Sequence, residues 1–386
     1  MKIALCLEYP IDQHGGTEVL VSELIKGLGS RHQVVLVSPD TSASLGRSPV
    51  APFVREHVPF SPQKPSVRWA KALADQVIRS KPDVVHFHFG GNYAWGARAF
   101  WNCPVTYFRR SHLPVVSTNH GAFSIFEGYC GEKRSMATKL ALWFPAWLSK
   151  QYVLSHLETE IAVSRFDYQA LGRWYPWSRH KFRWIYHSRL HGAPPPETVR
   201  REKIILCAGT IGERKGQWFL VDAFAHIAAK FPDWQLVFIG RSGDAMLQDR
   251  IQRCIDTNRL ADRVKLLGPQ SDDELRHWLG RAAIFAMPSL YEGLGLSLQE
   301  AQFYGCACIA TRCGGTVDLI EDGDNGLLVP VADPGSLAVG LEKLMTDEAL
   351  RQRFGRRAPE SVLEKNMTSG KMTEAYERLY SELLGR

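Results

Sequence analysis

Short runs of β-branched and apolar residues alternate with helical stretches along this 386-residue chain, and the alternation occurs twice. Short strands that are apolar throughout are typical of a sheet buried on both faces, and the intervening helices provide the crossovers that parallel strands need. The pattern therefore predicts an α/β architecture of doubly wound parallel sheets.

The first half of the chain supplies one such alternation. Its first strand is followed by a glycine loop at Gly15-Gly16 and then by a helix over about 17–28. Apolar β-branched composition marks the strands expected here, which are residues 2–7, 33–37, 82–88, 115–118, 161–164 and 182–186.

A proline-rich break at 191–197 can continue neither a helix nor a central strand, and it separates the two alternations. We therefore expect an N-terminal domain over 1–190 and a C-terminal domain over 198–369, with the ligand bound in the cleft between them. An amphipathic helix over about 370–386 is expected to pack back on the first domain. The second alternation has expected strands at 203–208, 234–239, 264–267, 284–287, 307–311 and 326–329 and helices at 216–230 and 271–281.

Charge is divided unevenly between the two halves. Residues 1–195 hold 23 Lys and Arg against 13 Asp and Glu, a balance of +10, whereas the whole chain carries +7. The remainder is therefore slightly acidic, with a balance of −3. A basic first half suggests that this half faces an anionic partner or surface.

Eight cysteines are scattered without a Cys-x-x-Cys pair, which favours small buried side chains in a reducing compartment. The N-terminal segment does not fit a secretory signal, because its apolar run breaks at Glu8. No stretch approaches the roughly 20 apolar residues that a membrane span needs. These observations predict a cytoplasmic protein.

The most informative motif for function lies between Pro288 and Gly326. Glu292 stands in a glycine-flanked loop, and Glu300 follows on the next predicted helix. The start of a helix has unpaired N–H groups and a partial positive charge, so it suits an anion such as a diphosphate. A carboxylate beside such a site needs hydrogen-bond donors, and sugar hydroxyls supply them. The pairing predicts a nucleotide-sugar site.

With these residues the chain resembles the retaining glycosyltransferases of family four, which have the GT-B fold of two Rossmann-like domains. The resemblance covers nearly the whole chain and rests on the segment from Glu292 to Glu300, followed by Ala301, Gly305 and Gly314-Gly315. Supporting segments are 209–216, 15–18 and 120–121.

The resemblance implies catalysis with a nucleoside-diphosphate sugar and without a bound metal or a separate cofactor. Arg214 and Lys215 would neutralise the departing diphosphate. Glu300 would accept hydrogen bonds from the ribose, and Glu292 would orient the donor sugar and stabilise positive charge at its anomeric carbon. The backbone N–H groups that would assist at the diphosphate belong to Gly293, Leu294, Gly295 and Leu296.

The resemblance also assigns roles to the first domain. Gly15 and Gly16 would let their loop approach the phosphates and the acceptor, and His120 would hydrogen-bond the donor sugar. The acceptor would attack the face from which the diphosphate leaves, so that the configuration of the sugar is retained and the departing phosphate takes the acceptor's proton.

Three positions depart from the family pattern. Thr210 stands where many members have an arginine, which removes one phosphate contact for which Arg214 could compensate. Leu294 replaces a common phenylalanine. The segment 186–190 stands where an Asn-Gly turn is usual, so the hinge between the domains is expected to differ.

Each candidate residue also has a purely structural interpretation. Glu292 and Glu300 could be solvated acids at helix ends, but the complete motif favours function. Residues 214–215 could be an exposed loop pair, and His120 could be a core or turn histidine. A turn before a helix explains Gly15-Gly16 equally well.

Two further patterns favour structural roles. His86 and His88 alternate on one strand, so we expect them to face opposite ways, with at most one directed at the cleft. Asp322 and Asp324 form the Asp-x-Asp pattern of metal-dependent glycosyltransferases. They lie in an Asp-Gly-Asp-Asn-Gly turn, which turn chemistry explains better, and no metal is expected.

Basic and aromatic residues are mixed in two segments, 133–150 and 173–184. This composition suits shallow docking on an anionic membrane, and it would also suit stacking on a sugar acceptor. Nucleic acid is the least plausible partner. The alternative is a helix packed into the core of the first domain, and Pro145 is expected to disrupt a long interfacial helix.

Together these observations predict a retaining glycosyltransferase that moves a hexose-like sugar to a polysaccharide or lipid-linked glycan acceptor. By analogy with the family, bacterial surface-polysaccharide assembly on the cytoplasmic face of the inner membrane is the expected setting. The alternatives are a nucleotide-sugar epimerase or phosphorylase of the same fold, or a non-catalytic subunit that binds sugar nucleotides.

Overall fold

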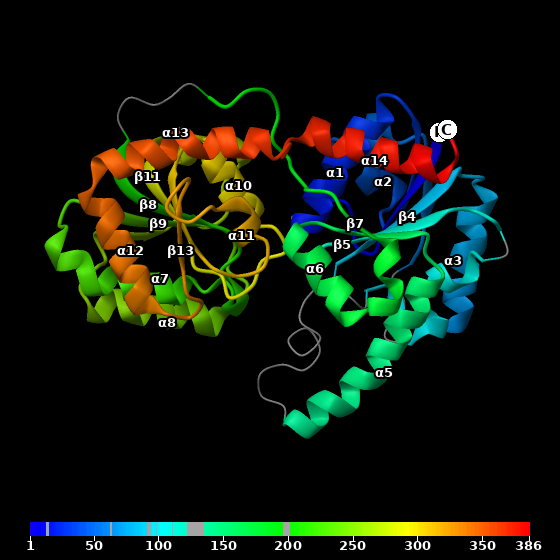
Figure 1. Ribbon diagram of the computed structural model, residues 1–386, viewed down its shortest axis with the longest axis horizontal. Helices are drawn as coiled ribbons and strands as arrows, with labels where there is room; N and C mark the ends of the chain where they lie inside the picture. The colour runs from blue at the N-terminus through cyan, green and yellow to red at the C-terminus, as the bar shows by residue number, and fades with distance from the viewer. Residues whose placement is uncertain are drawn as a thin grey trace. The chain divides into compact units, whose positions relative to one another are not determined.

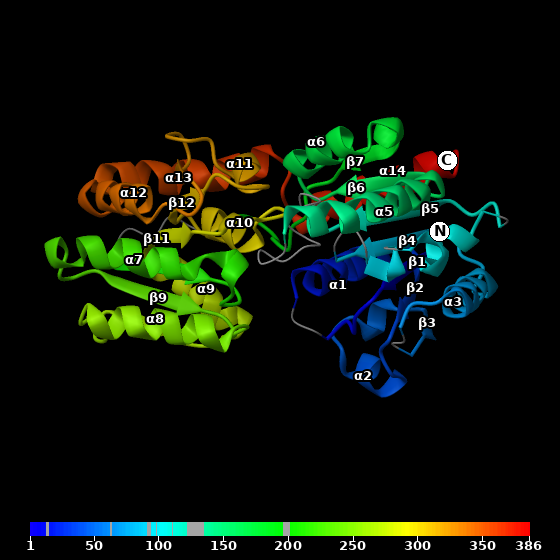
Figure 2. The same cartoon turned by 90° about the horizontal axis from the view of Figure 1, so that it is seen from below.

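The computed structural model describes residues 1–12, 15–61, 64–90, 94–97, 99–109, 111–121, 135–195 and 201–386, and for residues 136–140 and 142 the description is limited to the backbone. The chain forms two compact units (Figure 1). Unit 1 comprises Met1–Arg189 together with Thr368–Arg386, and unit 2 comprises Leu190–Met367. Each unit has a parallel sheet with helices on both faces (Figure 2), which confirms the predicted doubly wound α/β class.

The sheet of unit 1 has seven parallel strands in the order β3-β2-β1-β4-β5-β6-β7. From β1 the chain proceeds to β2 and β3 on one side and then returns to β4 on the other. The order of strands therefore reverses between β1 and β4, and such a switch point is where open α/β sheets bind ligands. The strands are β1 (Lys2–Leu7), β2 (Gln33–Ser38), β3 (Glu56–Pro59), β4 (Val84–Phe89), β5 (Val115–Asn119), β6 (Thr159–Ala162) and β7 (Phe182–Trp184).

Alternate residues of the unit 1 strands divide between two cores, one on each face of the sheet. Ile3 and Leu5 pack with α1 and α14 on one face, whereas Ala4 and Cys6 pack with α3 on the other. The helices of unit 1 are α1 (Gly16–Gly29), α2 (Ser42–Arg47), α3 (Val67–Arg79), α5 (Met136–Ser155), α6 (Arg165–Trp174) and α14 (Ser369–Leu383).

The expectation that His86 and His88 face opposite ways is wrong. Residues two positions apart on a strand point to the same face. The two rings lie 4.1 Å apart, on the face covered by α14. His86 Nδ1 lies 2.6 Å from the hydroxyl of Tyr380 on that helix, so this part of the buried face is a polar network.

Unit 2 has six parallel strands in the order β10-β9-β8-β11-β12-β13, with its switch point between β8 and β11. The strands are β8 (Glu202–Ala208), β9 (Gln235–Ile239), β10 (Val264–Leu266), β11 (Ala282–Met287), β12 (Ala307–Thr311) and β13 (Leu327–Val329). The helices are α7 (Gln217–Ile227), α8 (Ala245–Thr257), α9 (Asp272–Arg281), α10 (Leu296–Phe303), α11 (Thr316–Leu319), α12 (Pro334–Thr346) and α13 (Glu348–Glu364).

Helix α5 differs from expectation because it runs through Pro145. Proline removes one hydrogen bond from a helix interior. The buried side chains of Val153 and Leu154 offset that loss by packing in the unit 1 core. None of the helices in the described part of the chain combines the length and the apolarity needed to cross a membrane.

Candidate functional site

The switch point of unit 2 gathers the residues that the sequence predicts at the donor site. Residues 209–215 leave the carboxyl end of β8, and residues 288–295 leave the carboxyl end of β11. Because these strands are adjacent and parallel, the two segments emerge side by side at one edge of the sheet. Helix α10 begins directly after the second segment.

Glu292 is the centre of the side-chain cluster at this edge. Its side chain is buried, and its Oε1 accepts a hydrogen bond from Lys215 Nζ at 2.7 Å and another from Ser289 Oγ at 2.6 Å. The guanidinium of Arg214 lies 4.0 Å from Oε2 and is half exposed. The structure therefore brings Glu292, Lys215 and Arg214 together, as a catalytic site would require.

The surroundings of Glu292 keep its carboxyl group ionised. Burial alone would raise its pKa, but the charges of Lys215 and Arg214 and the hydrogen bonds from Lys215 and Ser289 outweigh burial and lower the pKa below its usual value. Glu292 is therefore an anion at neutral pH. It can accept hydrogen bonds from hydroxyl groups and stabilise positive charge.

Backbone packing fixes the loop that carries Glu292. Gly314 has a φ of +49°, and a Cβ there would lie 1.7 Å from the carbonyl oxygen of Glu292, so only glycine fits. Gly295 is the left-handed N-cap of α10, with a φ of +95°, and no side chain caps this helix. The first N–H groups of α10 thus start beside Gly293 and Leu294, where an anion could use them.

Glu300 lies on α10 and is buried. The helix places it one turn beyond Leu296 and on the same element as the uncapped N-terminus. The sequence therefore anticipated the helix that carries this acid but not its burial, and its part in ribose binding stays a prediction.

Two polar residues that support the site were given no role from the sequence. Ser289 holds Glu292, and Gln217 holds the other segment, because its Nε2 donates to the Thr210 carbonyl at 3.0 Å and its Oε1 accepts from the Gly212 N–H at 3.3 Å. Both side chains are almost fully buried. The available signal in the sequence was a polar residue in or beside each switch-point loop.

In unit 1, Gly15 and Gly16 lie at the start of α1, beside the carboxyl ends of β1 and β4. They help to line a cavity of about 230 Å³ at the switch point. The other residues lining this cavity are Leu7, Glu8, Tyr9, Thr17, Glu18, His88 and Gly90. This cavity lies wholly within unit 1.

His120 follows the end of β5 and contacts the same cavity only indirectly. Its Nε2 lies 3.1 Å from Nδ1 of His88, which lines the cavity, and its backbone N–H donates to the Phe89 carbonyl. Burial lowers the pKa of His120 to about 3, so its ring is neutral at pH 7. A neutral imidazole donates a hydrogen bond from one ring nitrogen and accepts one on the other.

The two carboxylates of the Asp-x-Asp pattern form ion pairs with arginines. Asp322 pairs with Arg312 at 3.0 Å and accepts from the backbone N–H of Leu328, and Asp324 pairs with Arg357 at 3.0 Å. Among the described residues, no three His, Cys, Asp or Glu side chains gather in a way that could hold a metal ion.

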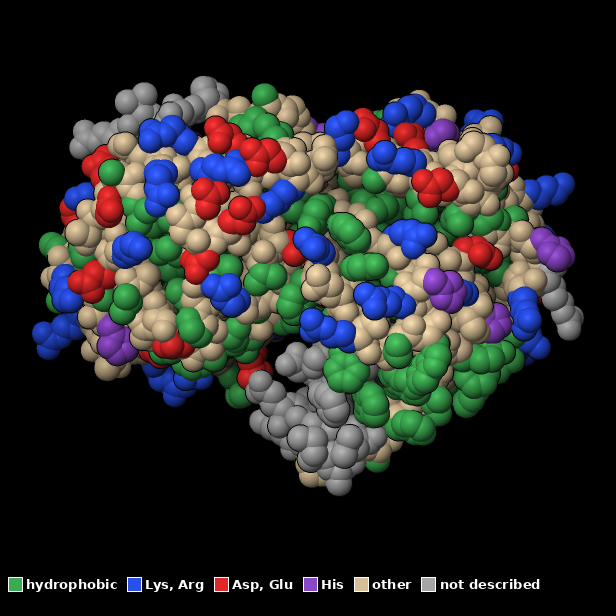
Figure 3. All heavy atoms as spheres, in the orientation of Figure 1, with side chains coloured by type: hydrophobic (Ala, Val, Ile, Leu, Met, Phe, Trp, Pro, Cys, Tyr) green, Lys and Arg blue, Asp and Glu red, His purple; other side chains and the backbone are tan. Residues whose placement is uncertain are grey.

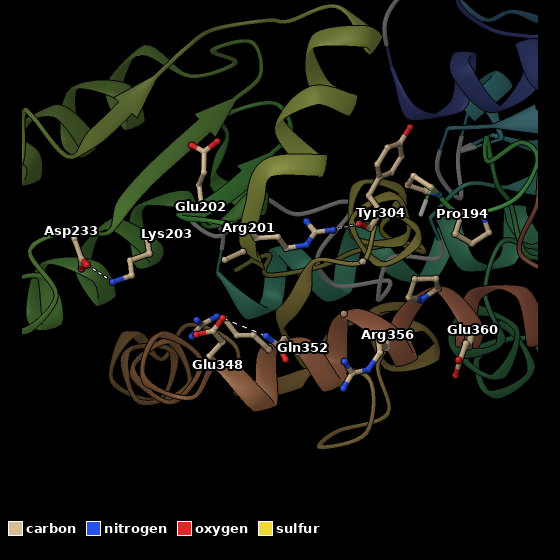
Figure 4. A pocket seen from close by; sticks show the side chains of 16 residues that line it. Pro194, Arg201, Glu202, Lys203, Asp233, Tyr304, Glu348, Gln352, Arg356 and Glu360 are labelled. Atoms are coloured by element: carbon tan, nitrogen blue, oxygen red, sulfur yellow. Dashed lines mark hydrogen bonds and ion pairs between the residues drawn. The ribbon is translucent and has the colours of Figure 1, made fainter. Parts of the chain in front are cut away.

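A cavity of about 920 Å³ lies at the opposite, amino-terminal edge of the unit 2 sheet (Figure 4). Its cations already have partners: Arg201 donates to the carbonyl oxygen of Tyr304, and Lys203 is paired with Asp233. Because β8 begins here, this cavity lies at the amino-terminal edge of the sheet, whereas the switch-point residues follow the carboxyl ends of the strands. We do not assign the donor site to it.

Two family models match the chain, one in its N-terminal half and one in its C-terminal half. The model for Glycosyltransferase Family 4 matches residues 14–188, and the model for Glycosyl transferases group 1 matches residues 194–361. Residues 194–361 therefore belong to the group 1 glycosyltransferases.

Curated relatives of this glycosyltransferase match 47% of the chain. A D-inositol 3-phosphate glycosyltransferase of Corynebacterium jeikeium is 32% identical over 189 residues, and an N-acetyl-alpha-D-glucosaminyl L-malate synthase of Bacillus anthracis is 33% identical over 183 residues. A lipopolysaccharide core biosynthesis glycosyltransferase of Rhizobium meliloti is 28% identical over 183 residues. The matched region spans about half the length of these relatives, at 44%, 46% and 51%.

Solved structures resemble this glycosyltransferase over nearly its full length. A glycosyltransferase from Rickettsia africae has a TM-score of 0.76 with 18% identity, covering 99% of this chain and 98% of its own. Anabaena HepE in complex with UDP has a TM-score of 0.75 with 18% identity, covering 99% and 100%. These likenesses confirm the GT-B fold that the sequence predicted.

Proposed function

We propose that the chain transfers a sugar from a nucleoside-diphosphate sugar to a polysaccharide or lipid-linked glycan acceptor, with retention of configuration and without a metal. The observation that carries the proposal is the buried Glu292, held by Lys215 and Ser289 at the unit 2 switch point beside an uncapped helix N-terminus. This arrangement offers cations, amide N–H groups and a carboxylate at one place, which is what a sugar diphosphate requires.

The diphosphate binds to cations and amides in this proposal. Lys215 and Arg214 supply two positive charges against one buried carboxylate, so the cluster keeps a net positive charge before the donor arrives. The N–H groups from Gly293 to Leu296 add donors at the start of α10. Two such cations can neutralise a leaving diphosphate in place of a divalent metal.

The acids then contact the hydroxyl groups on either side of the diphosphate. Glu300 accepts hydrogen bonds from the ribose, and Glu292 orients the donor sugar and stabilises charge at its anomeric carbon. His120, neutral at pH 7, donates or accepts a hydrogen bond on the same sugar. Attack from the face of departure, with the diphosphate as proton acceptor, gives retention.

The relatives support this donor and setting. The Anabaena structure holds UDP, and the curated relatives are named for transfer in inositol phosphate, malate and lipopolysaccharide core chemistry. A bacterial surface-glycan role at the cytoplasmic face of the membrane fits these names and the basic first half of the chain.

The test begins with a thermal-shift screen of UDP, GDP and ADP and their sugars, followed by transfer assays with the donor that binds. We expect Glu292→Ala to abolish transfer while nucleotide affinity stays within about threefold of wild type, since removing a transition-state contact lowers rate rather than binding. The matched control is Glu213→Ala, an exposed acid in the neighbouring loop.

Three results would contradict the proposal. Transfer by Glu292→Ala at the wild-type rate would remove the assigned role of this residue. Isomerisation of the donor sugar without an acceptor, or phosphorolysis of a glycan, would instead favour an epimerase or a phosphorylase. Binding of a donor with no turnover under any acceptor condition would favour a non-catalytic subunit.

Unit 1 also carries a surface suited to an anionic bilayer. Five large side chains that are 43% to 69% exposed lie on and beside α5, and Figure 3 shows hydrophobic side chains gathered there. We name this the aromatic surface, and it consists of Trp101, Phe144, Leu148, Tyr152 and Trp177. Aromatic side chains flanked by exposed arginines, here Arg173 and Arg179, favour the interface of an anionic membrane.

A further inference from the structure

A buried ion pair joins α5 to the sheet of unit 1. Lys150 on α5 donates to Oε2 of Glu160 on β6 at 2.6 Å, and both side chains are 0% exposed. Nζ of Lys150 also lies 4.8 Å from the centre of the Phe89 ring. Desolvation of two buried charges offsets most of their attraction, so such a pair contributes little stability compared with apolar side chains of the same size. Stability therefore does not account for the pair.

The carboxylate of Glu160 is also bonded to the neighbouring strand, β5. Ser117, its register partner, donates from Oγ to Oε2 at 3.1 Å, and Nδ2 of Asn119 donates to Oε1 at 3.4 Å. Residues two positions apart on a strand share a face, so both side chains lie on the face that α5 covers. Both are almost fully buried. The ion pair thus holds the carboxyl end of β5 from one side of the sheet.

Asn119 connects this ion pair to the turn that follows β5. Its Oδ1 accepts the backbone N–H of Gly121 at 3.1 Å. A carboxylate accepts hydrogen bonds and a backbone N–H donates them, so the Asn119 amide fits between Glu160 and Gly121 in one orientation only. An apolar side chain in place of Glu160 would leave that orientation unspecified on the side of the sheet.

The turn held in this way contains His120. The backbone N–H of His120 donates to the Phe89 carbonyl at 3.0 Å, and its ring Nε2 lies 3.1 Å from Nδ1 of His88. Because Asn119 and Gly121 flank His120 and are bonded to each other, the backbone of His120 is fixed on both sides. A misplacement of about 1 Å in a group that positions a substrate can lower the rate about a hundredfold.

We propose that Lys150 and Glu160 are positioning residues for sugar transfer, which act through Asn119 to hold the imidazole of His120 in place. Neither charged residue contacts the substrate. The inference rests on the proposed function, in which His120 bonds to the donor sugar. It makes α5 part of the support of the site.

The first test replaces the ion pair by apolar side chains of similar length, in the double variant Lys150→Met with Glu160→Leu. We expect kcat/KM for the sugar nucleotide to fall roughly ten- to a hundredfold, while the affinity for the nucleoside diphosphate, which lacks the transferred sugar, stays within about twofold of wild type. Urea denaturation should show no loss of stability. The matched control is Ser149→Ala, which removes a buried hydrogen bond from α5 to the Ala97 carbonyl and should lower stability but keep kcat/KM.

A cycle of variants separates positioning from a general structural effect. In a His120→Ala background, the apolar pair should change kcat/KM by less than about twofold, because the contact that it disturbs is already absent. The single variant Asn119→Ala breaks the link to Gly121 and keeps the ion pair, so it should reproduce the loss and the same dependence on His120. A loss of roughly tenfold or more in the His120→Ala background, or no loss in the wild-type background, would overturn the proposal.

The second test needs no transfer activity. Nuclear magnetic resonance of the chain with isotope-labelled histidine reports the surroundings and hydrogen bonds of each imidazole. We expect the ring signals of His120 and His88 to move in the apolar double variant, and those of the exposed His226 in unit 2 to stay. Unchanged His120 signals would contradict the inference even if the rate fell. A wild-type chain that transfers from no nucleotide sugar would refute the proposed function, while the ring signals would still show whether the ion pair holds His120.

Discussion

At the scale of single residues, the pair formed by Lys215 and Glu292 gives the candidate donor site its electrostatic balance. Removing one partner of a buried pair leaves an uncompensated charge and costs about 3–5 kcal/mol of stability. Arg214 is half exposed and lies 4.0 Å away, so it contributes less than Lys215 does. Lys215 holds Glu292 in the free protein, and in the proposed function it would also contact the diphosphate.

We expect Lys215→Met to weaken binding of the nucleoside diphosphate by roughly ten- to a hundredfold, because a charge-assisted contact contributes about 1.5–3 kcal/mol. Binding of the nucleoside alone should not change. Glu300→Gln should weaken the binding of both the nucleoside and the nucleoside diphosphate, since both contain the ribose. Isothermal titration calorimetry of each variant with the nucleoside and with the nucleoside diphosphate measures these differences in affinity.

The double variant Lys215→Met with Glu292→Gln serves as the folding control, because it removes both charges of the buried pair together. Lys203→Met is the matched surface control, at the opposite edge of the same sheet. Equal loss of affinity for nucleoside and nucleoside diphosphate in Lys215→Met would show that Lys215 does not contact the phosphates.

The sequence predicted the local element of each candidate residue better than the partners of its side chain. Glycines and a helix start placed Glu292 in a loop and Glu300 on a helix, because both signals are local. The pairing of Glu292 with Lys215, 77 positions away, depends on which strands are neighbours at the switch point. Ser289 and Gln217 were given no role from the sequence, because their roles follow from burial, which likewise depends on the arrangement of the strands.

At the scale of secondary-structure elements, α14 is joined to the unit 1 sheet by polar side chains. The Tyr376 hydroxyl lies 2.8 Å from Thr118 Oγ1 and 2.6 Å from His187 Nε2, and Tyr380 bonds to His86. Burial, with the charges of neighbouring histidines, lowers the pKa of His86 to about 3 and that of His187 well below its usual value. The network therefore requires neutral imidazoles.

This requirement predicts acid sensitivity of unit 1. The folded pKa values of His86, His88 and His187 lie below 6.5, so the unfolded chain binds more protons and stability is lost as pH falls below about 6.5. For His86, whose folded pKa is about 3, this loss amounts to roughly 2 kcal/mol between pH 6.5 and 5, which follows from about 1.4 kcal/mol per pH unit. Urea denaturation at several pH values measures the slope.

His86→Gln is the informative variant for this slope. It should be less stable at pH 7.5 and should depend less steeply on pH below 6.5, because one proton fewer is taken up on unfolding. The exposed His226→Gln serves as the control and should leave the slope unchanged. A slope in His86→Gln equal to that of the wild type would disprove the assigned protonation state.

Helix α5 leads to a prediction about membranes. We expect the double variant Phe144→Ser and Trp177→Ser to lose most of its flotation with phosphatidylglycerol vesicles, because the aromatic surface loses its two most exposed aromatic side chains. Met246→Ser removes an even more exposed apolar side chain from unit 2, and this variant should float as the wild type does.

Wild-type binding to zwitterionic phosphatidylcholine vesicles should be weak, since the attraction includes the charge of unit 1. If the wild-type chain binds neither kind of vesicle, the aromatic surface has no role in lipid binding. Transfer to a water-soluble acceptor should be unchanged in the double variant, because neither residue is assigned to the site.

Elements were predictable where their pattern was strong. Central strands such as β1 and β11 are apolar on both faces and were recognised from composition. The edge strand β3, Glu56–Pro59, is partly exposed and ends in proline, so it gave no strand pattern. The path of α5 through Pro145 depends on packing against the core, which local sequence does not show.

At the scale of the whole molecule, two doubly wound units account for the length of the chain and for its two separate candidate sites. The repeated alternation and the proline-rich break were sufficient to predict this class. Which residues of each unit meet at its switch point was not predictable from alternation alone, because that depends on strand order.

Two units with separate cores should unfold in two transitions. In differential scanning calorimetry we expect the nucleoside diphosphate to raise the transition of unit 2 by an amount that grows with ligand concentration, and to leave that of unit 1 unchanged. Tyr376→Phe, which removes a hydroxyl from α14, should lower the transition of unit 1 alone. A single transition shifted equally by both changes would show that the units unfold together.

The first strand, β1, and the last helix, α14, both belong to unit 1 (Figure 1). Asp83 lies near both termini, because its carboxylate accepts the backbone N–H of Lys2 and lies 3.9 Å from the guanidinium of Arg386. A molecule stretched by handles on its two termini would therefore first be loaded through α14 and β1. Unit 2 would feel no force until α14 had been peeled away, so optical tweezers should record the rupture of unit 1 first.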